Sequence, residues 1–72
     1  LSFKEKKELE TLENQIPEME AEKETIEHQI YQNPPSDYTE VESLSQRLAL
    51  LEQQIDQSTE RWMELEEIAS QE

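Results

Sequence analysis

The sequence predicts an all-α fold, a two-helix antiparallel coiled-coil hairpin whose first helix is kinked near Pro17. Two observations lead to this prediction. Each half of the 72-residue chain repeats apolar residues at alternating steps of three and four, the heptad pattern of coiled coils. Between the halves stand Pro34 and Pro35, which helix interiors exclude. We take residues 1–72 as one domain and, because the chain starts at Leu1 rather than Met, expect it to be part of a longer protein.

The first helix is predicted over about residues 4–32. Its heptad a and d residues, which we call the seam, are Leu9, Leu12, Ile16, Met19, Lys23, Ile26 and Ile30. Pro17 interrupts this helix, because it removes a backbone hydrogen bond and crowds the carbonyl of Glu13, at a cost of ~3 kcal/mol. Since the heptad keeps its phase across Pro17, we expect a kink with helix on both sides. We expect Phe3, which lies outside the heptad, to fold back near Leu65 and Ile68.

The second helix is predicted over about residues 38–70, after a loop at 33–37. Its seam is Val41, Leu44, Leu48, Leu51, Ile55, Ser58, Trp62, Leu65 and Ala69. Asp37 followed by Glu40 resembles a capping box, and Ser36 is the other candidate cap. So short a loop makes the two helices antiparallel neighbours, in a hairpin roughly 45 Å long.

Centring the turn near Pro35 sets the register of the seam. The expected facing pairs are Ile30 with Val41, Ile26 with Leu44, Lys23 with Leu48, Met19 with Leu51, Ile16 with Ile55, Leu12 with Ser58, and Leu9 with Trp62. Trp62 is most simply a core anchor, and the alternative is a partly exposed stacking surface. Tyr31 and Tyr38 flank the turn, where they would either close the tip or dock a partner.

The composition is strongly acidic, with 19 Asp and Glu against 6 Lys and Arg and a formal net charge of -13. Such a charge is typical of disordered chains, but the heptads argue for order, since the acids occupy outward positions around a regular seam. The chain has no Gly and no Cys, which excludes a Walker A loop, a dinucleotide fingerprint and disulfides. No apolar run approaches the ~20 residues of a membrane span, and no signal peptide is visible.

The residues that could carry chemistry are better explained as a solvated surface. Glutamates stand four apart at several places, such as Glu18 and Glu22, but acid–base catalysis needs a pKa-shifting pocket that a two-helix hairpin does not offer. His28 is the only histidine, and a metal site needs several ligands. We therefore expect no catalytic, cofactor or metal site, and no small-molecule ligand.

Basic residues gather at only one place, the end of the hairpin opposite the turn. Lys4, Lys6 and Lys7 begin the first helix, and Arg61 falls beside them in the expected register. These four are the candidate nucleic-acid-binding residues, because binding to phosphates requires a positive footprint. The competing interpretation is a set of salt-bridged surface residues, since glutamates are interleaved with them.

Motifs at both ends and at the turn are similar to one known family. The start of the chain reads Leu-Ser-Phe-Lys and then Glu8-Leu9-Glu10-x-Leu12, the turn reads Asn-Pro-Pro-Ser-Asp-Tyr over 33–38, and the end reads Glu-Arg-Trp-x-Glu-Leu-Glu over 60–66. Together they resemble the C-terminal domain of ABC-F ATPases, particularly the Uup type, over nearly the whole chain. The sequence departs from the family in having Glu13 after the second leucine, where proline is frequent, and Pro17 instead.

The resemblance implies a cytoplasmic ABC-F protein whose ATPase domains, with their ATP and magnesium, precede Leu1. It implies an antiparallel coiled-coil domain that helps the parent engage DNA, ribosomal RNA or the ribosome, with Lys4, Lys7 and Arg61 at basic places of the family motifs. We expect a non-catalytic, monomeric domain that has no membrane contact and whose partners include the parent's own ATPase domains. The alternative is a structural or protein-interaction hairpin that positions or regulates the ATPase without touching nucleic acid.

Overall fold

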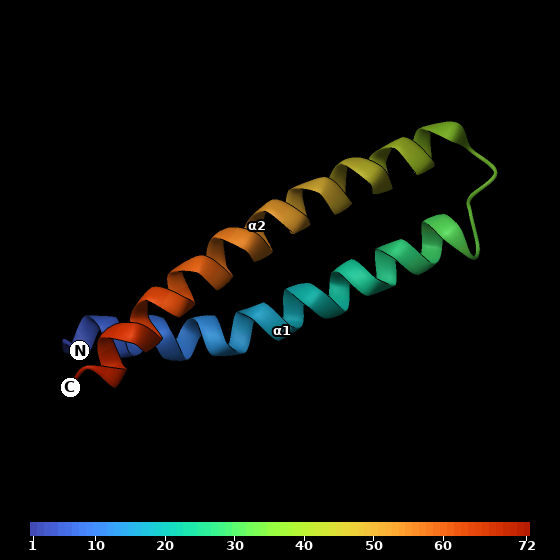
Figure 1. The fold of residues 1–72 in the computed structure, drawn as a ribbon. Helices are drawn as coiled ribbons and strands as arrows, with labels where there is room; N and C mark the ends of the chain where they lie inside the picture. Colours follow the sequence, from blue (N-terminus) through green and yellow to red (C-terminus); the bar gives the residue numbers. More distant parts are fainter.

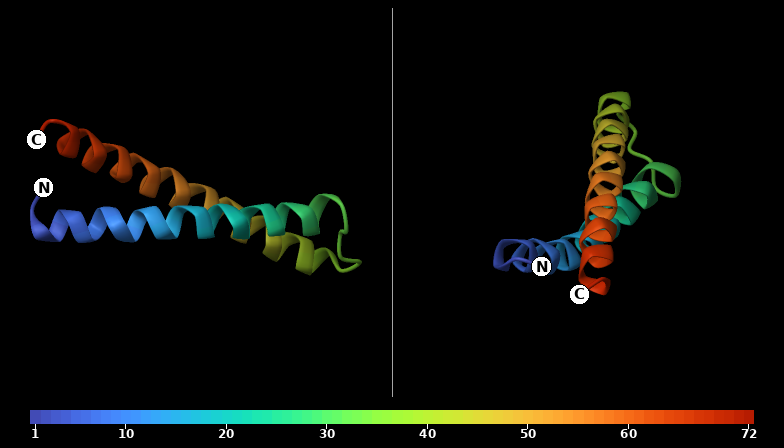
Figure 2. Two further views of the ribbon diagram at one scale, coloured as in Figure 1. Left: turned by 90° about the horizontal axis from the view of Figure 1, so that it is seen from below. Right: turned by 60° about the vertical axis from the view of Figure 1, so that its left-hand side comes forward.

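A computed structural model describes all of residues 1–72 as two helices joined by a short loop (Figure 1). Helix α1 spans Phe3–Tyr31 and helix α2 spans Tyr38–Ser70. The helices are antiparallel, so the two termini lie together at one end of a rod of 53 × 16 × 15 Å. We call this end the open end and the loop end the tip. Figure 2 shows that α2 crosses α1 obliquely, and the predicted all-α hairpin is confirmed.

A capping box starts α1 one residue earlier than the sequence predicted. The Glu5 N–H donates to the Ser2 hydroxyl at 3.1 Å, and the Ser2 N–H donates to the Glu5 carboxylate at 3.0 Å. Ser2 has extended backbone angles and is the N-cap. Two of the amides that a helix leaves without partners are thus satisfied, and Phe3 is already helical.

A few hydrogen bonds at the loop define the end of α1 and the start of α2. At the end of α1, the N–H groups of Gln32 and Asn33 both donate to the His28 carbonyl, at 3.0 and 3.2 Å. At the start of α2, Asp37 is the N-cap, and its carboxylate accepts from the Thr39 N–H at 2.9 Å. The predicted cap at Asp37 is therefore present, but its bond comes from Thr39, and the reciprocal bond of a capping box forms only in α1.

The heptad seam accounts for the core. All sixteen predicted seam positions are buried or half-buried, including the two polar ones, Lys23 and Ser58. The six fully buried residues all belong to the seam: Leu12, Ile26, Leu48, Leu51, Ile55 and Leu65. Ile26, Leu48 and Leu51 form a central cluster, against which Met19, Ile30 and Leu44 pack. The expected pairs of Ile26 with Leu44 and of Met19 with Leu51 both fall within this cluster.

Pro17 bends α1 without ending it. The helix continues from Phe3 to Tyr31 through Pro17, whose side chain is exposed. Figure 1 shows α1 bending between its dark-blue first turns and its teal second half. The predicted kink therefore takes the form of a bend, and the outward heptad position of Pro17 keeps the seam in phase on both sides.

Two expectations about aromatic side chains are wrong. Phe3 does not fold over the open end, since it is 82% exposed. The early start of α1 places Phe3 on the outward face, and the Leu1 side chain is buried in its stead, at 4% exposure. Tyr31 and Tyr38 do not close the tip either, since they are 72% and 79% exposed.

Candidate nucleic-acid interface

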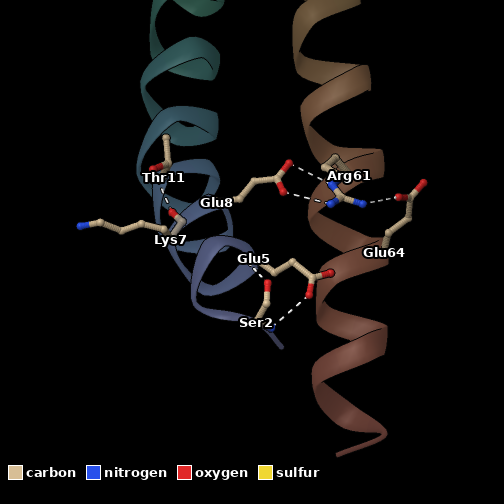
Figure 3. Close-up of polar contacts among 7 residues, drawn as sticks. All are labelled: Ser2, Glu5, Lys7, Glu8, Thr11, Arg61 and Glu64. Carbon is tan, nitrogen blue, oxygen red and sulfur yellow. Dashed lines mark hydrogen bonds and ion pairs between the residues drawn. The ribbon is translucent and has the colours of Figure 1, made fainter.

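The three predicted lysines are exposed side chains of the first two turns of α1. Lys4, Lys6 and Lys7 are all exposed, and none makes an ion pair within 4 Å. With 3.6 residues per turn, Lys7 falls opposite the seam residues Leu9 and Leu12, whereas Lys4 and Lys6 flank it on either side of the helix. Figure 3 shows the Lys7 side chain extending away from α2. The first two turns of α1 therefore present three ammonium groups to solvent. We call this exposed surface, with Lys4, Lys6 and Lys7, the lysine face.

Arg61, the fourth predicted residue, also lies at the open end but makes three hydrogen bonds to carboxylates. Its Nε and Nη2 donate to the two Glu8 oxygens at 2.9 and 3.0 Å, which joins α2 to α1 (Figure 3). Its Nη1 donates to the Glu64 carboxylate at 3.0 Å. A two-bond contact between a guanidinium and a carboxylate is among the stronger pairings available to a side chain. The structure thus leaves the three lysines unpaired on the first two turns of α1 but holds Arg61 between the helices, paired with two carboxylates.

The titration of these groups follows the contacts. The hydrogen bonds from Arg61 hold the pKa of the Glu8 carboxyl below its usual value of 4.5. The same bonds with Glu8 and Glu64 raise the pKa of Arg61. The pKa of the Glu5 carboxyl is also lowered. The largest cause is its hydrogen bond with the Ser2 backbone N–H, and the second is the Ser2 side chain. All these groups remain charged at neutral pH, so the Arg61–Glu8 pair is a fixed part of the open end.

A second ion pair joins the two helices nearer the middle of the rod. Arg47 Nη2 donates to the two Glu22 oxygens at 2.9 and 3.2 Å. Glu22 follows Glu8 by two heptads, and Arg47 precedes Arg61 by two heptads. All four occupy heptad g positions, which flank the seam and commonly pair between coiled-coil helices. Neither pair was predicted from the sequence, although the heptad phase places all four residues at flanking positions.

Phe3 also belongs to the lysine face, although the sequence predicted that its side chain would fold over the open end. Its position on α1 falls between those of Lys6 and Lys7 when viewed down the helix axis. An exposed aromatic ring among cationic side chains can stack on a base while the cations contact phosphates. The capping box at Ser2 fixes this arrangement, because it makes Phe3 helical.

Other kinds of site find little support in this structure. No group of three or more His, Asp or Glu side chains lies close enough to hold a metal ion. The surface hollows are shallow and open, and none lies over the lysine face. Neither helix is long and apolar enough to cross a membrane.

Comparison with known proteins agrees with the hairpin and its end motifs. The model of the ABC transporter C-terminal domain family matches residues 1–67, which includes all but the last turn of α2. The chain belongs to this family. No curated protein and no solved structure matches it. As an ABC transporter C-terminal domain, the hairpin is identified as one segment of an ABC protein, and both the lysine face and the Arg61–Glu8 pair lie within the matched residues.

Proposed function

We propose that this ABC transporter C-terminal domain is a non-catalytic module of an ABC-F ATPase that contributes to binding DNA, ribosomal RNA or the ribosome. The observation that carries the proposal is the lysine face, three exposed ammonium groups without a carboxylate partner in a chain of net charge -13. Everywhere else the surface repels phosphate. Contact with nucleic acid is therefore confined to the first two turns of α1.

Within this proposal the four predicted residues divide into two roles. Lys4, Lys6 and Lys7 contact phosphates, because their ammonium groups are free to release counterions from nucleic acid. Arg61 supports the interface by holding α1 against α2 through Glu8, since three of its N–H donors are already paired with carboxylates. Phe3 adds a stacking surface between the lysines.

A second candidate function is a protein-interaction hairpin that positions or regulates the ATPase. It is favoured by the exposed aromatic side chains at the tip, Tyr31 and Tyr38, which lie far from the lysine face along the 53 Å rod. In this function the lysines would only balance nearby glutamates. The two candidates differ in whether the isolated hairpin has measurable affinity for nucleic acid.

The test is a titration of the 72-residue chain into labelled duplex DNA and labelled ribosomal RNA over a series of salt concentrations. We expect measurable binding at low salt, with a slope of log K against log salt of about -2.7 on duplex DNA if three phosphates are contacted. Neutralising the lysines by K4Q, K6Q and K7Q together should remove the binding. The single variant R61Q should weaken it less.

The matched control places the same net charge elsewhere. Gln46, Gln53 and Gln57 are exposed on α2, and changing all three to Glu gives the same net charge as the triple lysine variant. The control should lose much less affinity than the lysine variant. Equal losses in the two variants would mean that only net charge matters, and an absence of binding at low salt would favour the protein-interaction function.

A further inference from the structure

The tip of the hairpin presents two aromatic rings to solvent. Tyr31 ends α1 and Tyr38 begins α2, so they bracket the loop, and they are 72% and 79% exposed. The loop between them contains Pro34 and Pro35, whose fixed φ angles restrict its motion. Exposed tyrosines held at the end of a rigid rod are typical of binding surfaces, since their rings offer large contact area at low entropic cost.

The charge around the tip has one sign only. Residues 24–46 contain five acids, Glu24, Glu27, Asp37, Glu40 and Glu42, and no Lys or Arg. The formal charge of this segment is therefore -5 with His28 neutral. The cationic residues nearest in sequence are Lys23, which is half-buried on the seam, and Arg47, which is paired with Glu22. A partner for the tip must bring its own positive charge.

Each tyrosine has a carboxylate one helical turn away on its own helix. Glu27 precedes Tyr31 by four residues, and Glu42 follows Tyr38 by four, spacings that place side chains on the same helix face. A shallow hollow on α1 is lined by Glu24, Glu27, His28 and Tyr31 among others, so the Tyr31 ring borders a depression with two carboxylates. A guanidinium stacked on such a ring would lie within reach of a carboxylate.

We propose that the tip docks an arginine-rich segment of a protein partner, with guanidinium groups stacked on Tyr31 and Tyr38 and paired with Glu27 and Glu42. Arginine fits better than lysine, because its planar group can stack and hydrogen-bond at the same time. The charge complementarity excludes the opposite occupant, a nucleic acid, whose phosphates the five acids would repel. This proposal does not depend on the lysine face, which lies at the other end of the rod.

The test uses the 72-residue chain and labelled octa-arginine as the probe, with octalysine for comparison, at about physiological salt. Removing both rings by Y31S and Y38S leaves the net charge unchanged. If each ring contributes a surface-exposed cation–π contact, the double variant should bind octa-arginine about five- to thirtyfold more weakly. Octalysine should bind more weakly than octa-arginine, and its affinity should decrease less when both tyrosines are replaced.

The matched control removes two exposed apolar side chains away from the tip, by L50S and M63S, positions that are 46% and 54% exposed. The control should bind octa-arginine within about twofold of the unchanged chain, since polycation attraction alone is insensitive to it. Backbone chemical shifts perturbed by octa-arginine should cluster around residues 24–42. Equal affinities of the tyrosine variant and the unchanged chain, or shifts spread evenly along the rod, would overturn the proposal. Tyrosine-dependent binding of a twelve-nucleotide thymidine strand in place of octa-arginine would also overturn it.

Discussion

The two ends of the hairpin share one seam but differ in everything around it. At the open end, three free lysines face solvent, and the Arg61–Glu8 pair and the Ser2–Glu5 capping box tie the chain together. At the tip, cationic side chains are absent and two tyrosines are exposed. The heptad therefore determines the fold, while the residues at the outward positions determine which partner each end can attract.

The two ends also differ in how they are held. The open end has a buried seam residue, Leu65, at 0% exposure, and the buried Leu1 side chain beside the chain terminus. The tip seam residues Ile30, Val41 and Leu44 are only half-buried. The open end therefore combines the fully buried Leu65 with an ion pair, whereas at the tip the half-buried Ile30 and Leu44 pack against the central cluster and the covalent turn joins the helices.

The largest expected effect comes from cutting the seam at the open end. Leu65→Ala should lower the free energy of unfolding by about 2–5 kcal/mol, because it removes a fully buried side chain and leaves a cavity. The equivalent change near the tip, Leu44→Ala, should cost less, since Leu44 already contacts water. Urea unfolding followed by circular dichroism would measure both, with the exposed Leu50→Ala as the control that changes stability little. A larger loss for Leu44 would reverse the comparison.

A smaller effect should separate the two helix caps. Ser2→Ala and Asp37→Ala should each destabilise by about 1 kcal/mol, because each removes an acceptor for a first-turn amide. Ser2→Ala should cost more, since it also releases Glu5 from the reciprocal bond of the capping box. The conservative variants Ser2→Thr and Asp37→Ser keep an oxygen acceptor and should recover most of the loss. Thermal unfolding of the four variants provides the measurement, and a costlier Asp37→Ala would contradict the ranking.

The seam could be predicted from the sequence because burial in a coiled coil follows the three- and four-residue spacing of apolar side chains, which can be counted directly. It placed all sixteen seam positions away from full exposure, including the polar Lys23 and Ser58. Local capping could have been read from the Ser-x-x-Glu at the start, yet the Asp-x-x-Glu at the turn carries the same signal, and only Ser2 forms the box. Helix α1 begins one residue earlier than predicted, and Phe3 therefore lies on the outward face and does not fold over the open end.

The candidate site was harder to predict than the seam. Whether two charged side chains pair depends on the direction in which each points around its helix axis, and not only on their distance along the hairpin. Arg61 lies at the open end as expected, but its g position turns it toward Glu8 and away from the lysines. The three lysines are outside the seam, so the spacing of apolar residues does not show whether they have partners. Tyr31 and Tyr38 both lie outside the seam, and both are exposed.

The smallest expected effect is a pH dependence confined to the open end. The bond to Arg61 lowers the folded pKa of Glu8, and the bonds to Ser2 lower that of Glu5. A lowered folded pKa contributes stability that is fully present above the ordinary carboxyl value of 4.5 and is lost as the pH falls through the folded pKa. Acid also relieves repulsion among the 19 acidic residues, but that gain is distributed along the whole rod. Amide protection factors near Glu8, divided by those near Leu44, should therefore decrease on acidification from about pH 6 to 3, and Glu8→Gln should flatten the change. A ratio that stays constant in the unchanged chain would show that the Arg61–Glu8 pair does not distinguish the two ends.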